Sequence, residues 1–350
     1  MTHEDLDIEG PVILVPNHVN TWDPLLVAMS LRHKQVYYVA SEHIFRKGLL
    51  SRLLVWMVAP IPMKKGSLGT ETVRTCLRHL KAGHSVCIFS EGEQSWNGIS
   101  RPVSPAIGKL VKASGASLVT YRLEGSYLSK PRWADTVRRG KVHGHPVGIY
   151  APETLKGMTP EEIAQTVDRD IYENAWERQE KERINYKGKR LAEGLERALY
   201  LCPGCRRIST LKTSGSVLTC SCGLSIAYRE DGFFEPSVPF RHIAEWDEWQ
   251  REALVTGDFV HGSELFSDDK VQLSEIMPDH TEIHLASGRL IQNPESIALK
   301  EYSFSLKDID NMAMTRTHIL LFSSGDRYYL MSAEPGINFR KYLEIYSAGR

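Results

Sequence analysis

A histidine and an aspartate five residues apart are the first candidates for chemistry in this chain. His18 and Asp23 lie in a loop between two apolar stretches, which predict a strand before the loop and a helix after it. An aspartate beside an imidazole fixes the tautomer of the ring and supports its positive charge, so the pair could act as a general base towards a hydroxyl group. A surface histidine and an aspartate that caps a helix before Pro24 would give the same pattern.

A second polar loop follows another apolar stretch. The segment Ser85–Phe89 predicts a buried strand, and Glu91 and Gly92 come soon after it. Open α/β sheets bind their ligands at the carboxyl ends of parallel strands. Because the strands before His18 and before Glu91 would end at the same edge of a sheet, the two loops could face one cleft. A tight turn with solvated acids is the alternative.

Taken together, the two loops resemble the signature blocks of the glycerolipid acyltransferases, which include the lysophosphatidate acyltransferases. Asn17-His18 followed by Asp23 is similar to the family's N-H-x4-D block, and Phe89–Gly92 with Ser95 is similar to its F-P-E-G-T-R-S block. Between them, Val58–Lys65 stands where the family has a short block that ends in a basic residue. The resemblance covers residues 10 to 190.

In that family the histidine is the general base and the aspartate orients it, which implies these roles for His18 and Asp23. The resemblance implies direct attack of a lysophospholipid hydroxyl on the thioester of acyl-CoA or acyl-carrier protein, in phospholipid biosynthesis, and it favours 1-acylglycerol-3-phosphate as the acceptor. No acyl-enzyme is expected. The residues that we assign to substrate binding are Asn17, Lys64, Lys65, Glu91, Gly92, Ser95 and Arg101.

The chain departs from the family's pattern at three places. Ser90 replaces a proline, Glu93-Gln94 replaces Thr-Arg, and Thr120 stands where a proline is usual. The change at Gln94 removes an arginine that would meet the acceptor's phosphate. The cations that could replace it are Lys64, Lys65 and Arg101. The alternative is a different lipid acceptor, such as an amino-acid-based lipid or a glycolipid.

Four of the six cysteines form two close pairs, and these are Cys202, Cys205, Cys220 and Cys222. A disulfide scaffold would spread its cysteines through a small secreted domain, so this cluster favours reduced thiols and a metal. Four thiolates suit zinc and fill its tetrahedral coordination sphere, which predicts a structural site in a zinc-ribbon-like module. Four unrelated thiols are the alternative.

Composition limits the partners of the chain. The 350 residues include 43 Lys and Arg and 43 Asp and Glu, and this neutral balance argues against nucleic-acid binding. The longest apolar stretch, Leu49–Pro62, is interrupted by Ser51 and Arg52 and falls short of the roughly 20 residues that span a bilayer. Acidic residues at the N-terminus do not resemble a signal peptide. We therefore expect a cytoplasmic protein.

One stretch could bind a membrane surface. Ile44–Val58 reads as an apolar helix whose basic residues could face anionic headgroups, which predicts peripheral association with the inner face of the membrane. A core helix with solvated basic residues is the alternative. A non-catalytic scaffold, in which the cysteine module and the C-terminal region recruit a partner at the membrane, is a further alternative to the enzyme.

The elements that must position these residues alternate between strand and helix over the first 150 residues. This order predicts an α/β fold, with a mostly parallel sheet flanked by helices. A capping box at Thr159–Glu162 predicts a helix that runs to about Arg183, and the charged stretch Glu177–Arg197 predicts an exposed helix.

From Lys270 onwards the pattern changes to short strands, with turns at Gly288 and Ser324-Gly325, and then a final helix over Ile337–Tyr346. This predicts a small β-rich domain closed by one helix, which resembles pleckstrin-homology-like domains in pattern. We therefore divide the chain into an acyltransferase domain (1–190), a zinc-ribbon-like module (198–235) and the β-rich domain (260–350).

Overall fold

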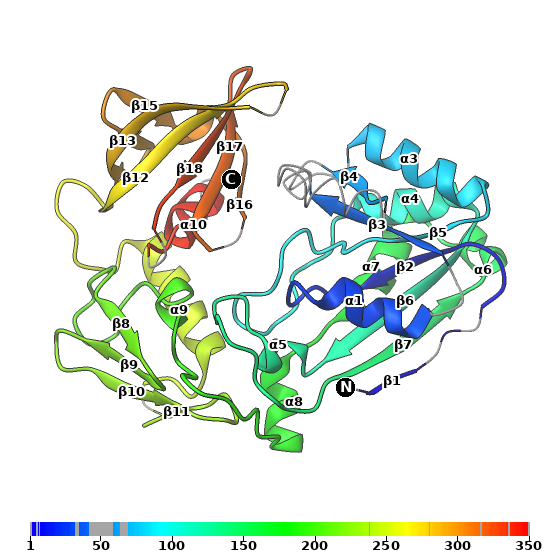
Figure 1. Ribbon diagram of the computed structural model, residues 1–350, viewed down its shortest axis with the longest axis horizontal. Helices are drawn as coiled ribbons and strands as arrows, with labels where there is room; N and C mark the ends of the chain where they lie inside the picture. Colours follow the sequence, from blue (N-terminus) through cyan, green and yellow to red (C-terminus); the bar gives the residue numbers. More distant parts are fainter. Residues whose placement is uncertain are drawn as a thin grey trace. The chain divides into compact units, whose positions relative to one another are not determined.

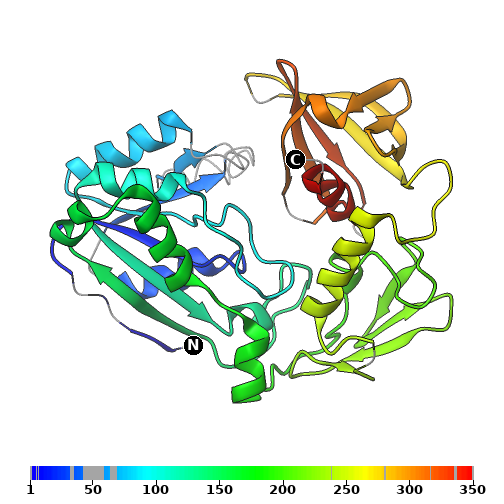
Figure 2. The ribbon, with the colours of Figure 1, turned by 180° about the vertical axis from the view of Figure 1, so that it is seen from behind.

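The computed structural model separates the chain into two compact units (Figures 1 and 2). The first comprises Met1–Arg132 and Arg138–Tyr186, and the second comprises Trp133–Val137 and Lys187–Arg350. The structure describes residues 2–4, 6, 8–31, 35–41, 59–63, 69–237, 239–279, 281–315, 317–334 and 337–348. Within these residues no helix is both long and apolar enough to cross a membrane.

A mixed sheet forms the centre of the first unit. Its described strands lie in the order β1-β7-β6-β2-β5-β3-β4; all neighbouring pairs are parallel except β6 and β7. This arrangement confirms the predicted fold class. The bounds are β1 Thr2–His3, β2 Val12–Pro16, β3 Val36–Ser41, β4 Ile61–Met63, β5 Ser85–Cys87, β6 Ser117–Glu124 and β7 His143–Tyr150.

Helices cover both faces of this sheet, as Figures 1 and 2 show. On β2, Ile13 and Val15 join a buried cluster with residues of α3, α4, α6 and α7, while Val12 and Leu14 join a second cluster with residues of α1 and η1. A central strand buried on both faces explains the uninterrupted apolar run. The bounds are α1 Asp23–Ala28, η1 Met29–Leu31, α3 Thr70–Lys81, α4 Ala106–Ser114, α5 Ser126–Ser129, α6 Pro152–Gly157, α7 Pro160–Ile171 and α8 Ala175–Glu182.

The long helix predicted after Thr159 is two helices. The capping box is present with both of its hydrogen bonds, but α7 ends at Ile171, and the side chain of Asn174 caps a new helix, α8. Between them, the backbone of 173–175 pairs with the loop at 98–100 instead of continuing the helix. The exposed helix predicted over Glu177–Arg197 is also wrong, because α8 ends at Glu182 and only a short 3-10 turn, η3 (Leu195–Arg197), follows.

Two antiparallel sheets and the helices α9 and α10 make up most of the second unit within the part of the chain that the structure describes. A four-stranded sheet, in the order β11-β10-β9-β8, carries two of the clustered cysteines at or beside its strands. The predicted β-rich region forms a sheet in the order β15-β14-β13-β12-β18-β17-β16 within the described residues. The bounds are β8 Leu211–Ser214, β9 Val217–Cys220, β10 Ser225–Tyr228, β11 Phe234–Glu235, α9 Ile243–Thr256, β12 Phe266–Ile276, β13 Glu282–Gln292, β14 Ser296–Leu299, β15 Tyr302–Ser305, η4 Leu306–Asp308, β16 Ile309–Thr315, β17 Ile319–Ser324, β18 Arg327–Ser332 and α10 Arg340–Ala348.

Gly288 does not form the predicted turn. It lies inside the single long strand β13 and pairs with Val271, where β12 bulges. The bulge accommodates the extra residue of β12, so that pairing continues past Gly288. The two strands expected on either side of Gly288 therefore form one strand. Strands β14 and β16 were not predicted from the sequence pattern. The cysteine module and the β-rich region lie within one compact unit, whereas the division of the chain into three domains stays a prediction.

Candidate active site

His18 lies in the loop that follows β2, at the carboxyl end of a central parallel strand. Its Nδ1 is 2.9 Å from Oδ2 of Asp23, the first residue of α1. The histidine side chain is 20% exposed, whereas that of Asp23 is fully buried. The imidazole can therefore meet a substrate while its carboxylate partner is shielded from water, which strengthens their interaction.

Asp23 does not act as the cap of α1, since the capping position is Trp22. Instead, Oδ2 of Asp23 accepts hydrogen bonds from the backbone nitrogens of Val19 and Asn20, at 2.6 and 2.8 Å. The carboxylate thus organises the loop that carries its own histidine partner. This arrangement supports the pairing of His18 with Asp23 over the alternative of a simple helix cap.

Two asparagines attach this loop to the end of β6 and to the start of α5. The side chain of Asn17 donates to the carbonyl of Leu123 at 3.2 Å and accepts from its nitrogen at 2.7 Å. Asn20 donates to the hydroxyl oxygen of Ser126 at 2.6 Å, and that hydroxyl donates to Asp23 Oδ1 at 3.3 Å. Asn17 is fully buried. Its amide therefore anchors the loop, and the role in substrate binding expected from sequence stays a prediction.

Glu91 joins the second loop to the first. Its Oε1 accepts from the backbone nitrogen of His18 at 2.6 Å, and its Oε2 accepts from the backbone nitrogen of Arg101 at 2.7 Å. Burial raises the pKa of Glu91 to about 8, although the two backbone donors oppose this shift. The nitrogen of Ser95 also donates to the carbonyl of His18 at 3.1 Å. The two loops identified from sequence are therefore in direct contact.

Gly92 and Ser95 shape the second loop. Gly92 has φ of +73°, and a Cβ at this position would meet no atom within 4 Å, so the backbone conformation alone favours glycine. The buried hydroxyl of Ser95 donates to the carbonyl of Ile99 at 2.8 Å and accepts from the nitrogen of Gly98 at 2.9 Å. The ring of Phe89 lies 4.3 Å from that of His18, centroid to centroid.

Two arginines gather beside this loop. Nη1 of Arg101 and Nη1 of Arg132 lie 3.1 and 3.6 Å from Oε2 of Glu93. Arg132 also donates to the carbonyl of Gln94 at 3.1 Å, and its guanidinium lies 4.1 Å from the ring centroid of Trp96. Sequence reasoning identified Arg101 but missed Arg132, because no local pattern links it to Gln94. Lys64, Lys65 and the whole of the membrane candidate Ile44–Val58 lie outside the described residues.

The four clustered cysteines converge in the second unit. Their sulfur atoms all lie within 4.8 Å of one another. The Sγ atoms of Cys202 and Cys222 are 3.6 Å apart, and those of Cys205 and Cys220 are 3.7 Å apart. Four sulfurs held about 2.3 Å from a tetrahedral zinc ion would be about 3.8 Å from each other. The donor set and its spacing therefore fit a metal ion with four thiolate ligands.

Comparison with known proteins agrees with the motifs of the first unit. Residues 2–124 match the family model described as Acyltransferase, which confirms the acyltransferase resemblance of the two loops. Among solved structures, the 1-acyl-sn-glycerophosphate (LPA) acyltransferase PlsC from Thermotoga maritima is similar at 18% sequence identity. That match covers 49% of this chain and 68% of the PlsC chain, with a TM-score of 0.42.

Proposed function

We propose that this chain, whose residues 2–124 form an acyltransferase domain, moves a fatty acyl group from acyl-CoA or acyl-carrier protein to the hydroxyl of a lysophospholipid. The favoured acceptor is 1-acylglycerol-3-phosphate, which would place the reaction in phospholipid biosynthesis. The observation that carries the proposal is the hydrogen bond between His18 and Asp23, at the carboxyl end of β2 in that domain.

The proposed base is Nε2 of His18. Because Asp23 accepts a hydrogen bond from Nδ1, the neutral ring carries its proton on Nδ1 and its lone pair on Nε2. Nε2 takes the proton of the acceptor's hydroxyl while that oxygen attacks the carbonyl carbon of the thioester. The tetrahedral intermediate then expels the thiolate, which takes the proton back from the imidazolium. The carboxylate of Asp23 stabilises the imidazolium, and the acyl group passes to the acceptor without an acyl-enzyme.

Two guanidinium groups support a phosphate-bearing acceptor. Arg101 and Arg132 share the single carboxylate of Glu93, so these three side chains carry an excess of positive charge beside the loop of His18. Arg132 contacts the carbonyl of Gln94, the position at which the resembling family has an arginine. A planar guanidinium matches a phosphate group through paired N–H donors. Arg132, which is 38 residues from Gln94 in the chain, would thus supply the guanidinium group that Gln94 lacks.

Exposed apolar side chains around α1 support peripheral attachment to the inner face of the membrane. Trp22, Leu25 and Met29 are 52%, 58% and 43% exposed. Their spacing of three and four residues is that of side chains that share a helix face. They immediately follow the loop of His18. Contact of this face with lipid would therefore hold the base close to the layer in which a lysophospholipid resides.

For the cysteine cluster we propose zinc in a structural role. Four thiolates favour zinc over oxygen-preferring cations, and with four ligands no position remains for a substrate. Gly204 permits the close approach of the knuckle, since a Cβ there would lie 3.3 Å from Sγ of Cys222. Cys202, Cys205, Cys220 and Cys222 would then hold the loops around β8 and β9 together.

Replacement of the base tests the proposed reaction. The purified full chain is incubated with labelled acyl-CoA or acyl-carrier protein and a lysophospholipid, and products are identified by lipid mass spectrometry. His18→Ala should abolish transfer and keep its melting temperature, whereas the exposed His284→Ala serves as the matched control with wild-type activity. Transfer at the wild-type rate by folded His18→Ala would refute the mechanism.

A panel of acceptors tests the substrate. The panel contains 1-acylglycerol-3-phosphate, a neutral lysophospholipid, an amino-acid-based lipid and a glycolipid. We expect the phosphate monoester to have the highest kcat/KM, and Arg132→Gln to reduce it for this acceptor more than for a glycolipid. A preference for an acceptor without phosphate would favour the alternative substrate class, and no transfer to any acceptor would favour the scaffold.

A further inference from the structure

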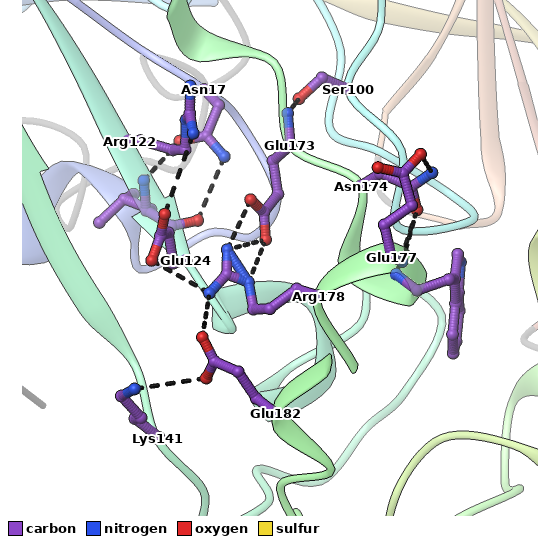
Figure 3. Close-up of polar contacts among 12 residues, drawn as sticks. Asn17, Ser100, Arg122, Glu124, Lys141, Glu173, Asn174, Glu177, Arg178 and Glu182 are labelled. Atoms are coloured by element: carbon purple, nitrogen blue, oxygen red, sulfur yellow. Dashed lines mark hydrogen bonds and ion pairs between the residues drawn. The ribbon is translucent and has the colours of Figure 1, made fainter. Parts of the chain in front are cut away.

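An arginine outside both loops of the site contacts three carboxylates. Arg178, on α8, has a side chain that is 14% exposed. Its Nη2 lies 2.6 Å from both carboxylate oxygens of Glu173, and its Nη1 lies 3.0 Å from Oε2 of Glu124 and 3.4 Å from Oε1 of Glu182 (Figure 3). The guanidinium thus bridges two residues that belong to different segments, Glu124 at the end of β6 and Glu173 before α8.

The Glu124 side of this bridge leads to the residue before His18. Glu124 directly follows Leu123, whose backbone nitrogen and carbonyl are both bonded to the side chain of Asn17. Asn17 is covalently joined to His18. A shift of the end of β6 would therefore move the amide that anchors the histidine loop.

The Glu173 side of the bridge leads to the backbone of His18 itself. The nitrogen of Glu173 donates to Oγ of Ser100 at 3.0 Å, and the nitrogen of Ser100 donates to the carbonyl of Glu173 at 2.9 Å. The next residue, Arg101, donates its backbone nitrogen to Glu91, and the other oxygen of Glu91 accepts from the nitrogen of His18. This second path thus reaches the histidine from the opposite side of the loop.

We propose that Arg178 is a positioning residue for acyl transfer, because its guanidinium fixes the spacing of the two supports that hold His18, through Glu124 and Asn17 on one side and through Glu173 and Glu91 on the other. The inference rests on the proposed role of His18 as the base. Arginine suits this position because its rigid fork can donate to two carboxylates at once, whereas lysine offers one point charge. Without the cation, Glu173 would lose its guanidinium partner, and Glu124 would keep only His145, at 3.2 Å, and Arg122, at 4.0 Å.

The test compares Arg178→Lys and Arg178→Gln in the full chain with Lys141→Met. Lys141 pairs with Glu182 at the edge of the same network and is 62% exposed, so it controls for the loss of one positive charge. We expect Arg178→Gln to lower kcat about 10- to 100-fold with little change in KM, since a misplacement of about 1 Å can reduce rates by about 100-fold. Arg178→Lys should recover part of kcat, and Lys141→Met should match the wild type.

Hydrogen exchange supplies a readout that does not depend on activity. In Arg178→Gln, peptides that contain the backbone amides of His18 and Leu123 should exchange about tenfold faster or more, while peptides of α3 should be unchanged. A kcat within twofold of the wild type in folded Arg178→Gln would overturn the inference, as would a fall in kcat without faster exchange at His18. If the wild type itself transfers no acyl group, the proposed function fails, whereas the exchange data still decide whether Arg178 holds the loop. If Arg178→Gln does not fold, the milder Arg178→Lys decides by the same two criteria.

Discussion

The role of Asp23 as an electrostatic partner of His18 can be separated from its role in building the loop. In Asp23→Asn, the amide oxygen can take the place of Oδ2 and accept from Nδ1 of His18 and from the nitrogens of Val19 and Asn20. The amide nitrogen then takes the place of Oδ1 and donates to the hydroxyl of Ser126. The substitution therefore keeps the backbone contacts of the loop and the tautomer of the ring, removes the negative charge, and reverses the hydrogen bond with Ser126.

The size of the effect follows from that lost charge. A hydrogen bond to a charged group contributes about 1.5–3 kcal/mol, and the charge matters most when the imidazole becomes imidazolium in the transition state. Because about 1.4 kcal/mol corresponds to a tenfold change in rate, we expect kcat to fall about 10- to 150-fold. Asp23→Ala should lose more, since it also leaves the nitrogens of Val19 and Asn20 without their acceptor.

The assay measures kcat at saturating donor and acceptor, together with the melting temperature of each variant. Asp168→Asn is the matched control, because Asp168 also accepts a backbone hydrogen bond, from Val103 at 2.9 Å, but is not part of the His18 loop. Its kcat should stay within twofold of the wild type. If Asp23→Asn were stable and retained full kcat, Asp23 would be only a structural residue of the loop, and the proposed support of the imidazolium would be wrong.

Three further predictions address stability, metal and membrane. Burial raises the pKa of Glu91 to about 8, so the stabilisation from its protonated form is fully present below pH 4.5 and is lost as the pH rises to 8. The free energy of unfolding measured with urea should therefore fall over this pH range, and Glu91→Gln should reduce the fall by roughly 3–5 kcal/mol at most. Elemental analysis should find about one zinc per chain, and Cys222→Ser should lower its occupancy and destabilise the second unit; pure wild-type protein without metal would refute the zinc site. Trp22→Ser with Leu25→Ser should reduce binding to anionic phospholipid vesicles at least tenfold relative to Ile149→Ser, another exposed apolar residue, and equal binding by the two variants would exclude α1 as the contact.

Local patterns were sufficient to predict the elements whose boundaries depend on neighbours in the chain. The apolar run of β2 and the capping box of α7 are examples, and both are present. The break between α7 and α8 was missed, although Asn174 followed by Glu177 is itself a helix-start signal. The helix stops because the backbone of 173–175 pairs with the loop at 98–100, which is more than 70 residues away in the chain. Sequence periodicity carries no information on such pairing.

The same distinction separates the parts of the candidate site. His18 and Asp23 are five residues apart, so a local pattern indicated them as a candidate pair, and the second loop and the family resemblance favoured this pairing over a helix cap. The bonds that hold this pair in place join residues far apart in the chain: Asn17 to Leu123, His18 to Glu91, and Arg178 to both Glu124 and Glu173. Each of these contacts joins residues that are distant in the chain, and none leaves a periodic signal in the sequence. A motif can therefore name a base and its partner, while the precision with which the base meets a hydroxyl depends on residues that only the fold brings together.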